Sequence, residues 1–258
     1  LIAPVAVRNW VVGGDGVGIS YNLGVNFYIG NNPSYEETVA IRPGWEWDAL
    51  ITQPAKLGIN RPSEKSAYFL NRSLTDITAD PLWWMGLLMN KVTEFWHGDE
   101  VGRNQPIYYW RNYSTVLWLT LWKGGIAFPF GLMAPLAIWG LLLSLRQVGS
   151  TWPAIYVITY LIGVAMFFIA ARYRVPVLPV LLIFAVYGLG ALCGWVRERR
   201  WKNAGLGLAI CAIFLLPANR ELGSMGMTGD AAIHYNIGNA YAEAGDRHRA
   251  VEAFTRSV

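Results

Sequence analysis

The sequence predicts an all-α polytopic membrane protein with a helix-rich extracytoplasmic layer and a C-terminal helical hairpin. Of its 258 residues, 54% are hydrophobic, and no Asp or Glu occurs between Gly124 and Val196. The apolar residues there form runs close to the length that a helix needs to cross a bilayer. The last 28 residues are instead rich in polar helix formers. Since globular helices carry one polar face for water, we expect the apolar runs to lie in a membrane.

We divide the chain into four parts. They are the end of a truncated membrane span (1–7), an extracytoplasmic loop domain with surface helices (8–123), four transmembrane helices (124–218), and a linker with a partial repeat (219–258). The chain starts with the apolar LIAPVAV, which lacks the charged start of a signal peptide. We therefore expect a fragment of a longer protein.

The four membrane spans are expected at 126–145, 153–171, 175–195 and 204–217. The segment RERRWK at 197–202 is the most basic short stretch, and cytoplasmic loops of membrane proteins are enriched in Lys and Arg. We therefore place it in the cytoplasm of a cell with an inner (plasma) membrane. The loop 8–123, residues 172–174 and the C-terminus then lie on the extracytoplasmic side.

The extracytoplasmic part is expected to be mainly helical. VVGGDGVGIS at 11–20 favours turns and short strands, whereas 61–81 has Ala67, Leu70, Leu74 and Ile77 at helical spacing on one face. Asp80 and Pro81 then predict the start of a second helix, which ends near WHG. Its apolar and aromatic content is typical of a helix lying in a membrane surface.

ARYRVPVLP, at 171–179, places two arginines between apolar runs. One interpretation is that Arg172 and Arg174 cap a tight interfacial turn while the prolines start the next helix. The other is that they bind an anion, because a guanidinium donates two parallel hydrogen bonds to phosphate oxygens. A lipid-linked phosphate at the outer membrane surface would suit this position.

GVNFYIGNNP, at 24–33, is a second candidate. Its amides, Asn26, Asn31 and Asn32, and its aromatic rings at Phe27 and Tyr28 suit sugar hydroxyls and sugar rings. Gly-Asn-Asn-Pro is strong turn chemistry, so these residues alone favour a simple turn over a sugar site.

Other polar segments are weaker candidates. WHGDE at 96–100 could act in acid–base chemistry, but a solvated loop is the simpler interpretation. The three histidines lie apart from one another and from the cysteines, so we expect no metal site. Cys193 and Cys211 lie in apolar runs and are expected to behave as small hydrophobic residues. A formal charge of +4 without a long basic tract gives no reason to expect a nucleic-acid partner.

The C-terminal residues Gly238, Tyr241, Gly245, Ala250 and Phe254 resemble the tetratricopeptide repeat, in which small residues let two helices pack closely. The whole chain resembles the C-terminal half of bacterial dolichyl-phosphate-mannose-protein mannosyltransferase-like membrane glycosyltransferases of the GT-C type, several of which continue into such repeats. The segments that carry the resemblance are, in order, PVAVRNWVV, GVNFYIGNNP, EFWHGDEVGRNQPIYYWRNYS, GLMAPLAIWGLLL and ARYRVPVLPVLLIFA.

The resemblance implies an enzyme that transfers a sugar from a polyprenyl-phosphate donor to a lipid, glycan or protein acceptor outside the membrane. It implies that Arg172, Tyr173 and Arg174 hold the donor phosphate and that Asn26, Tyr28, Asn31 and Asn32 line the cavity. The catalytic carboxylate, with or without a divalent metal, would lie in an N-terminal loop outside these 258 residues. The fragment alone would then be inactive, and its repeats would recruit a protein partner.

Two other functions stay open. The chain could be a non-enzymatic scaffold whose membrane helices only tether the repeats, or part of a polymerase or ligase of surface polysaccharide. An acidic pair after the first span of the parent protein would favour the transferase.

Overall fold

The computed structural model describes residues 3–17, 20–41, 44–100, 107–145, 147, 149, 151–220 and 230–256. Helices dominate this part of the chain, and its strands β1 (Trp122–Gly124) and β2 (Ile126–Phe128) form a single antiparallel pair. The all-α class is therefore confirmed. The chain divides into two compact units: unit 1 is Leu1–Phe95 with Ile158–Ile169, and unit 2 is Trp96–Val157 with Ala170–Val258.

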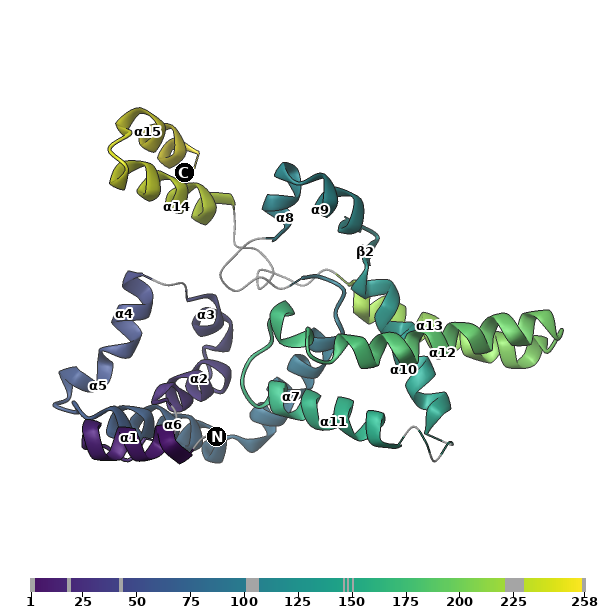
Figure 1. The fold of residues 1–258 in the computed structure, drawn as a ribbon, viewed down its shortest axis with the longest axis horizontal. Helices are drawn as coiled ribbons and strands as arrows, with labels where there is room; N and C mark the ends of the chain where they lie inside the picture. Colours follow the sequence, from purple (N-terminus) through teal and green to yellow (C-terminus); the bar gives the residue numbers. More distant parts are fainter. Residues whose placement is uncertain are drawn as a thin grey trace. The chain divides into compact units, whose positions relative to one another are not determined.

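Besides residues 158–169, unit 1 contains the following helices, which are coloured purple to blue in Figure 1. They are α1 (Ala3–Gly13), α2 (Asn22–Gly30), α3 (Tyr35–Ala40), α4 (Trp45–Ile51), α5 (Gln53–Lys56), α6 (Pro62–Ala79) and α7 (Pro81–Trp96). The expectation of short strands at 11–20 was wrong for its described residues, because α1 continues to Gly13 and bends follow it.

Helices α6 and α7 confirm the two helices predicted between residues 61 and 97. The side chain of Asp80 accepts a hydrogen bond from the backbone N of Trp83 at 2.9 Å, as expected of an N-terminal cap. The predicted apolar face of α6 is not the one that packs, since Leu74 is 44% exposed. Phe69 and Ser73 are buried instead, and the Phe69 ring lies 5.5 Å from the Tyr28 ring of α2.

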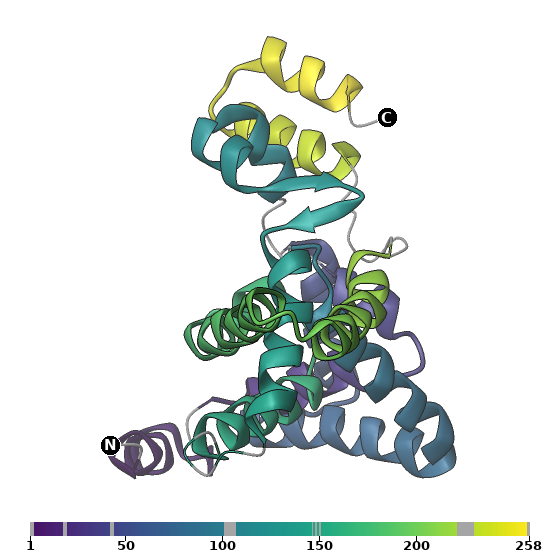
Figure 2. The same ribbon diagram turned by 90° about the vertical axis from the view of Figure 1, so that its right-hand side faces the viewer.

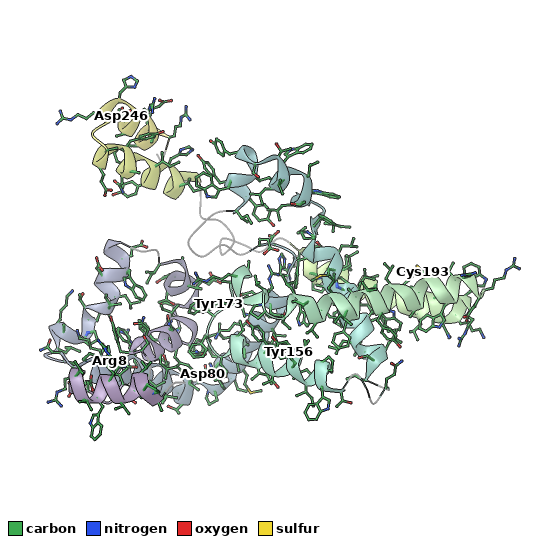
Figure 3. The ribbon with its side chains drawn as sticks, in the orientation of Figure 1. Arg8, Asp80, Tyr156, Tyr173, Cys193 and Asp246 are labelled. Carbon is green, nitrogen blue, oxygen red and sulfur yellow. The ribbon has the colours of Figure 1, made fainter. Side chains whose placement is uncertain are left out.

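The structured elements of unit 2 begin after the loop 97–100. Up to Asn219 they are α8 (Ile107–Trp110), η1 (Arg111–Tyr113), α9 (Thr115–Thr120), the pair β1–β2, α10 (Phe130–Ser144), the first part of α11 (Thr151–Ala165), η3 (Ala171–Arg174), α12 (Leu178–Arg197) and α13 (Trp201–Asn219). Helices α12 and α13 run side by side in opposite directions (Figure 1). Cys193, on α12, and Cys211, on α13, are both free (Figure 3).

Helices α10 and α12 approach each other closely at two glycines. A Cβ atom built on Gly140 would lie 1.8 Å from the backbone O of Phe184, and one on Gly188 would lie 2.7 Å from the backbone O of Leu136. Small residues at helix contacts are typical of packing within membranes, where backbone proximity replaces the hydrophobic effect.

Two of the four expected spans, α12 and α13, have the length and apolar composition needed to cross a membrane. Their outward apolar side chains, such as Ile183 and Leu216, are largely exposed in the isolated chain. Helices α10 and α11 are apolar but have only 15 residues each. The multi-pass arrangement therefore stays a prediction.

The expected start of the first span at 126 was wrong. Residues Ile126–Phe128 form strand β2, because Gly125 adopts φ +80° and turns the chain back onto β1. The Trp122 and Phe128 rings stack with their centroids 4.4 Å apart. Helix α10 begins only at Phe130.

The C-terminal residues form the expected helical hairpin, α14 (Asp230–Glu243) and α15 (Arg247–Thr255), drawn in yellow in Figure 2. A Cβ atom on Gly238 would lie 2.5 Å from the ring of Phe254, so the glycine makes room for that aromatic side chain. Asp246, labelled in Figure 3, caps α15 by accepting from the backbone N of Arg249 at 3.1 Å. The assignment of the hairpin α14–α15 to the tetratricopeptide repeat stays a prediction.

Candidate functional site

Arg174 is the buried centre of a polar cluster in unit 2. It ends η3, and its side chain is only 2% exposed. Its guanidinium donates to the backbone oxygens of His97 and Asp99 and to Glu100 Oε2, the last at 2.9 Å. The guanidinium carbon lies 4.1 Å from the centre of the Phe130 ring. Arg174 therefore holds the loop 97–100 through both a charge and two carbonyls.

The loop 97–100 is not the solvated loop that its composition favoured. His97 and Asp99 are buried, and the Glu100 side chain is 21% exposed. His97 Nδ1 accepts from the backbone N of Asp99 at 3.0 Å, while its Nε2 donates to the backbone O of Arg220. The backbone N of Gly98 donates to the O of Ala218. These bonds hold His97 and Gly98 against the end of α13 and the residue that follows it.

Burial controls the proton equilibria in this cluster. It lowers the pKa of Arg174, against the pull of Glu100, yet an arginine remains protonated at physiological pH. Burial also raises the pKa of Tyr108 to about 12, helped by the carboxylates of Asp99 and Glu100. The Tyr108 oxygen accepts from the backbone N of Glu100 at 3.1 Å. The cluster therefore contains a fixed cation, two carboxyl groups and a protonated phenol.

Arg172 differs from Arg174 although both belong to the same turn. Its side chain is exposed, donates to the hydroxyl of Tyr173 at 3.0 Å and lies over that ring at 5.0 Å. Figure 3 labels Tyr173. Within the described residues, the Arg172 guanidinium has no carboxylate partner. The motif thus has one arginine committed to the protein and one available to a ligand.

The other predicted site residues lie in unit 1, where Asn31 and Asn32 are buried. Asn32 Nδ2 donates to the O of Tyr28 at 2.7 Å and to Thr38 Oγ1 at 2.9 Å, and its Oδ1 accepts from the backbone N of Ser34. Residues 31–34 form the turn that the segment by itself favoured, here placed after helix α2.

Asn31 joins several segments of unit 1. Its Nδ2 donates to the backbone O of Met166 at 2.8 Å, and its Oδ1 accepts from Trp84 Nε1 and Lys91 Nζ. Tyr28 is buried under the Arg72 guanidinium, and Asn26 is half-buried. The amides of Asn31 and Asn32 thus make bonds within the protein, and a cavity-lining role for these residues stays a prediction.

Two functional candidates, Lys91 and Glu94, were missed by the sequence interpretation. Both are buried on α7, while Leu82, Met85 and Met89 of the same helix are exposed. The available signal was two opposite charges three residues apart in an otherwise apolar helix. A charge that faces the interior is unusual enough to mark a polar cluster.

Within the described residues, no group of three or more His, Cys, Asp or Glu side chains is arranged to hold a metal ion. Comparisons of the chain with protein-family models, with curated proteins and with solved structures find no match. The function is therefore argued from the residues themselves.

Proposed function

We propose that this chain is the C-terminal part of a membrane glycosyltransferase that moves a sugar from a polyprenyl-phosphate donor to a lipid, glycan or protein acceptor outside the inner membrane. Arg172 contacts the donor phosphate. The exposed guanidinium of Arg172, stacked on Tyr173 and close in sequence to the apolar helix α12, is the observation that carries this proposal.

The chemistry of Arg172 suits a phosphate on a lipid. A guanidinium matches phosphate oxygens with parallel hydrogen bonds, and stacking on Tyr173 limits the side-chain freedom lost on binding. The prenyl chain of the donor would extend along apolar helix surfaces such as that of α12, where Ile183 and Val186 are exposed. Tyr173 orients the arginine and need not contact the donor.

Arg174 serves a different purpose in the same motif. Its bonds to the loop 97–100 make it a positioning residue, which refines the expectation that both arginines hold phosphate. The catalytic carboxylate of the parent enzyme, with any divalent metal it needs, belongs to the N-terminal loop implied by the family resemblance. The 258 residues then supply donor binding without turnover.

Donor binding can be measured on the chain itself in lipid nanodiscs with polyprenyl phosphate as the probe and polyprenol, which lacks the phosphate, as the reference. We expect the wild type to prefer the phosphate and Arg172→Ala to lose that preference, with Arg172→Lys retaining part of it. Arg197→Ala, at the opposite end of α12, is the matched control. Equal binding of the two lipids by the wild type would refute the proposal.

The same lipid comparison decides between the transferase and a membrane-anchored scaffold. The scaffold is favoured by the folded hairpin α14–α15, because tetratricopeptide hairpins stack into protein-binding arrays. A scaffold needs no preference for polyprenyl phosphate. Orientation is tested separately: a reporter fused after Lys202 should be cytoplasmic, and one fused after Arg174 or Val258 should be extracytoplasmic.

A further inference from the structure

Lys91 occupies an unusual position inside unit 1. It is fully buried, and its Nζ donates to Asn31 Oδ1 at 3.2 Å and to the backbone O of Ala165 at 3.1 Å. Ala165 is the last residue of α11. An ammonium at the C-terminal end of a helix is favoured by the helix dipole and satisfies a carbonyl that has no partner in the helix. Lys91 therefore ties α7 to the end of α11 and to the Asn31 turn.

Glu94 lies three residues further along α7 and makes a separate connection. Its Oε2 accepts from the hydroxyl of Tyr35 at 3.1 Å, and Tyr35 is the first residue of α3. Glu94 therefore ties α7 to α3. Within the described residues, no ion pair joins Glu94 to Lys91, so the two charges influence each other without a direct contact.

Among the described residues, the groups that face this pair come from α3, the Asn31 turn and α11. Helix α3 contributes Tyr35, whose ring centre lies 5.3 Å from Lys91 Nζ, and Glu36, which adds a negative charge near Glu94. The Asn31 turn contributes a neutral amide, and α11 contributes a carbonyl. With neutral hydrogen-bond partners and little water, each buried group loses part of the stabilisation of its charged form.

We propose that Lys91 and Glu94 form a two-way proton latch in unit 1. When both are protonated, the cationic Lys91 holds the end of α11 and the Asn31 turn; when both have lost their protons, the anionic Glu94 holds α3 through Tyr35. Hydrogen bonds to an ionised group are about twice as strong as neutral ones, so each of these hydrogen-bonded ties is strong in one state and weak in the other, while the contact of the Lys91 cation with the Tyr35 ring adds only a weaker link to α3.

The two groups change state in the same pH range. Burial lowers the pKa of Lys91 to about 7, against the opposing effect of Glu94. Burial also raises the pKa of Glu94 to about 7, against the effects of the Tyr35 hydrogen bond and the Lys91 charge. Raising the pH through neutrality thus weakens the tie to α11 while it strengthens the tie to α3.

Hydrogen exchange of the full chain in detergent, read by mass spectrometry from pH 5.5 to 8.5 and corrected for intrinsic exchange, tests the latch. Protection at the end of α11 should fall with rising pH while protection of α3 rises, each by at most about tenfold per pH unit, the limit for one proton. Helix α6 is the internal reference. If protection of α11 and of α3 changes in the same direction with pH, the proposal is wrong. Because this measurement uses the wild type, it tests the latch even if a variant does not fold.

Single variants separate the two halves of the latch. Lys91→Met should remove the pH dependence at the end of α11 and keep that of α3, and Glu94→Gln should do the reverse. The matched controls are Lys56→Met and Glu64→Gln, which change exposed residues of unit 1 and should alter neither trend. Persistence of both trends in either latch variant would also rule out the latch.

Discussion

The Arg174 guanidinium donates to Glu100 Oε2 at 2.9 Å and thereby joins the turn before α12 to the loop that follows α7. The arginine side chain is 2% exposed and the glutamate 21%, so the pair is shielded on one side only. A half-shielded pair loses part of its hydration but keeps an acceptor that water can reach. The geometry favours a fixed loop over a site open to ligands.

We predict that Arg174→Ala destabilises the chain without a specific effect on phosphate recognition. The variant leaves the carbonyls of His97 and Asp99 without their donor and Glu100 without its cation. The loss should be about 3 kcal/mol, the low end for breaking a buried pair, because Glu100 can rehydrate. Thermal unfolding in detergent measures this loss. If Arg174→Ala is as stable as Arg172→Ala, Arg174 does not hold the loop 97–100, and a loss of phosphate preference without loss of stability would contradict this role as well.

A second prediction concerns the contact between α10 and α12. Gly140→Ala introduces a methyl group where a Cβ would lie 1.8 Å from the backbone O of Phe184, so the helices must separate. Overpacking of this kind costs about 1–3 kcal/mol. Gly190→Ala on α12 is the matched control, because nothing lies within 4 Å of its Cβ position. Equal unfolding temperatures for the two variants would show that the close approach does not stabilise the chain.

A third prediction concerns the start of α7. Asp80→Ala removes the acceptor for the backbone N of Trp83 and should cost about 1 kcal/mol, the usual value for an N-terminal cap. Asp80→Asn retains a side-chain oxygen and should restore most of the stability. If both variants unfold at the wild-type temperature, the cap does not contribute to the stability of the chain.

The local features were predicted from the sequence more successfully than the contacts. Proline and aspartate define the junction between α6 and α7 through their own backbone geometry and hydrogen bonding, so they could be recognised without the fold. The packing face of α6 could not, because Phe69 and Ser73 are buried in a helix that packs against α2, and apolar periodicity alone does not reveal that contact. The start of α10 was misplaced because strand β2 is as apolar as the helix that follows it.

The candidate site was predicted only in part, for the same reason. Arg172 and Arg174 stand out in an apolar stretch, but their different roles depend on Glu100, which is 74 residues away from Arg174 in the chain. Asn31 attracted attention as turn chemistry, whereas its bonds to Lys91 and Met166 require three distant segments to meet. Long-range pairs of this kind leave no local periodicity in a single sequence.

A last prediction gives the pH dependence of stability contributed by Lys91 and Glu94. The folded pKa of Glu94, about 7, lies above its ordinary value of 4.5, so the native state binds more protons between these values and stability falls as pH rises through them. The folded pKa of Lys91, about 7, lies below its ordinary value of 10.5, so the unfolded state binds more protons and stability rises from about pH 7 upward. The contribution of the pair to stability should therefore be least favourable near neutrality.

Thermal unfolding of the wild type and of the double variant Lys91→Met/Glu94→Gln at pH 5, 7 and 9 measures this contribution as the difference in stability between the two proteins at each pH. The difference should reach its minimum at pH 7, and a difference that changes in one direction across the three pH values would show that only one of the two groups is displaced from its ordinary pKa.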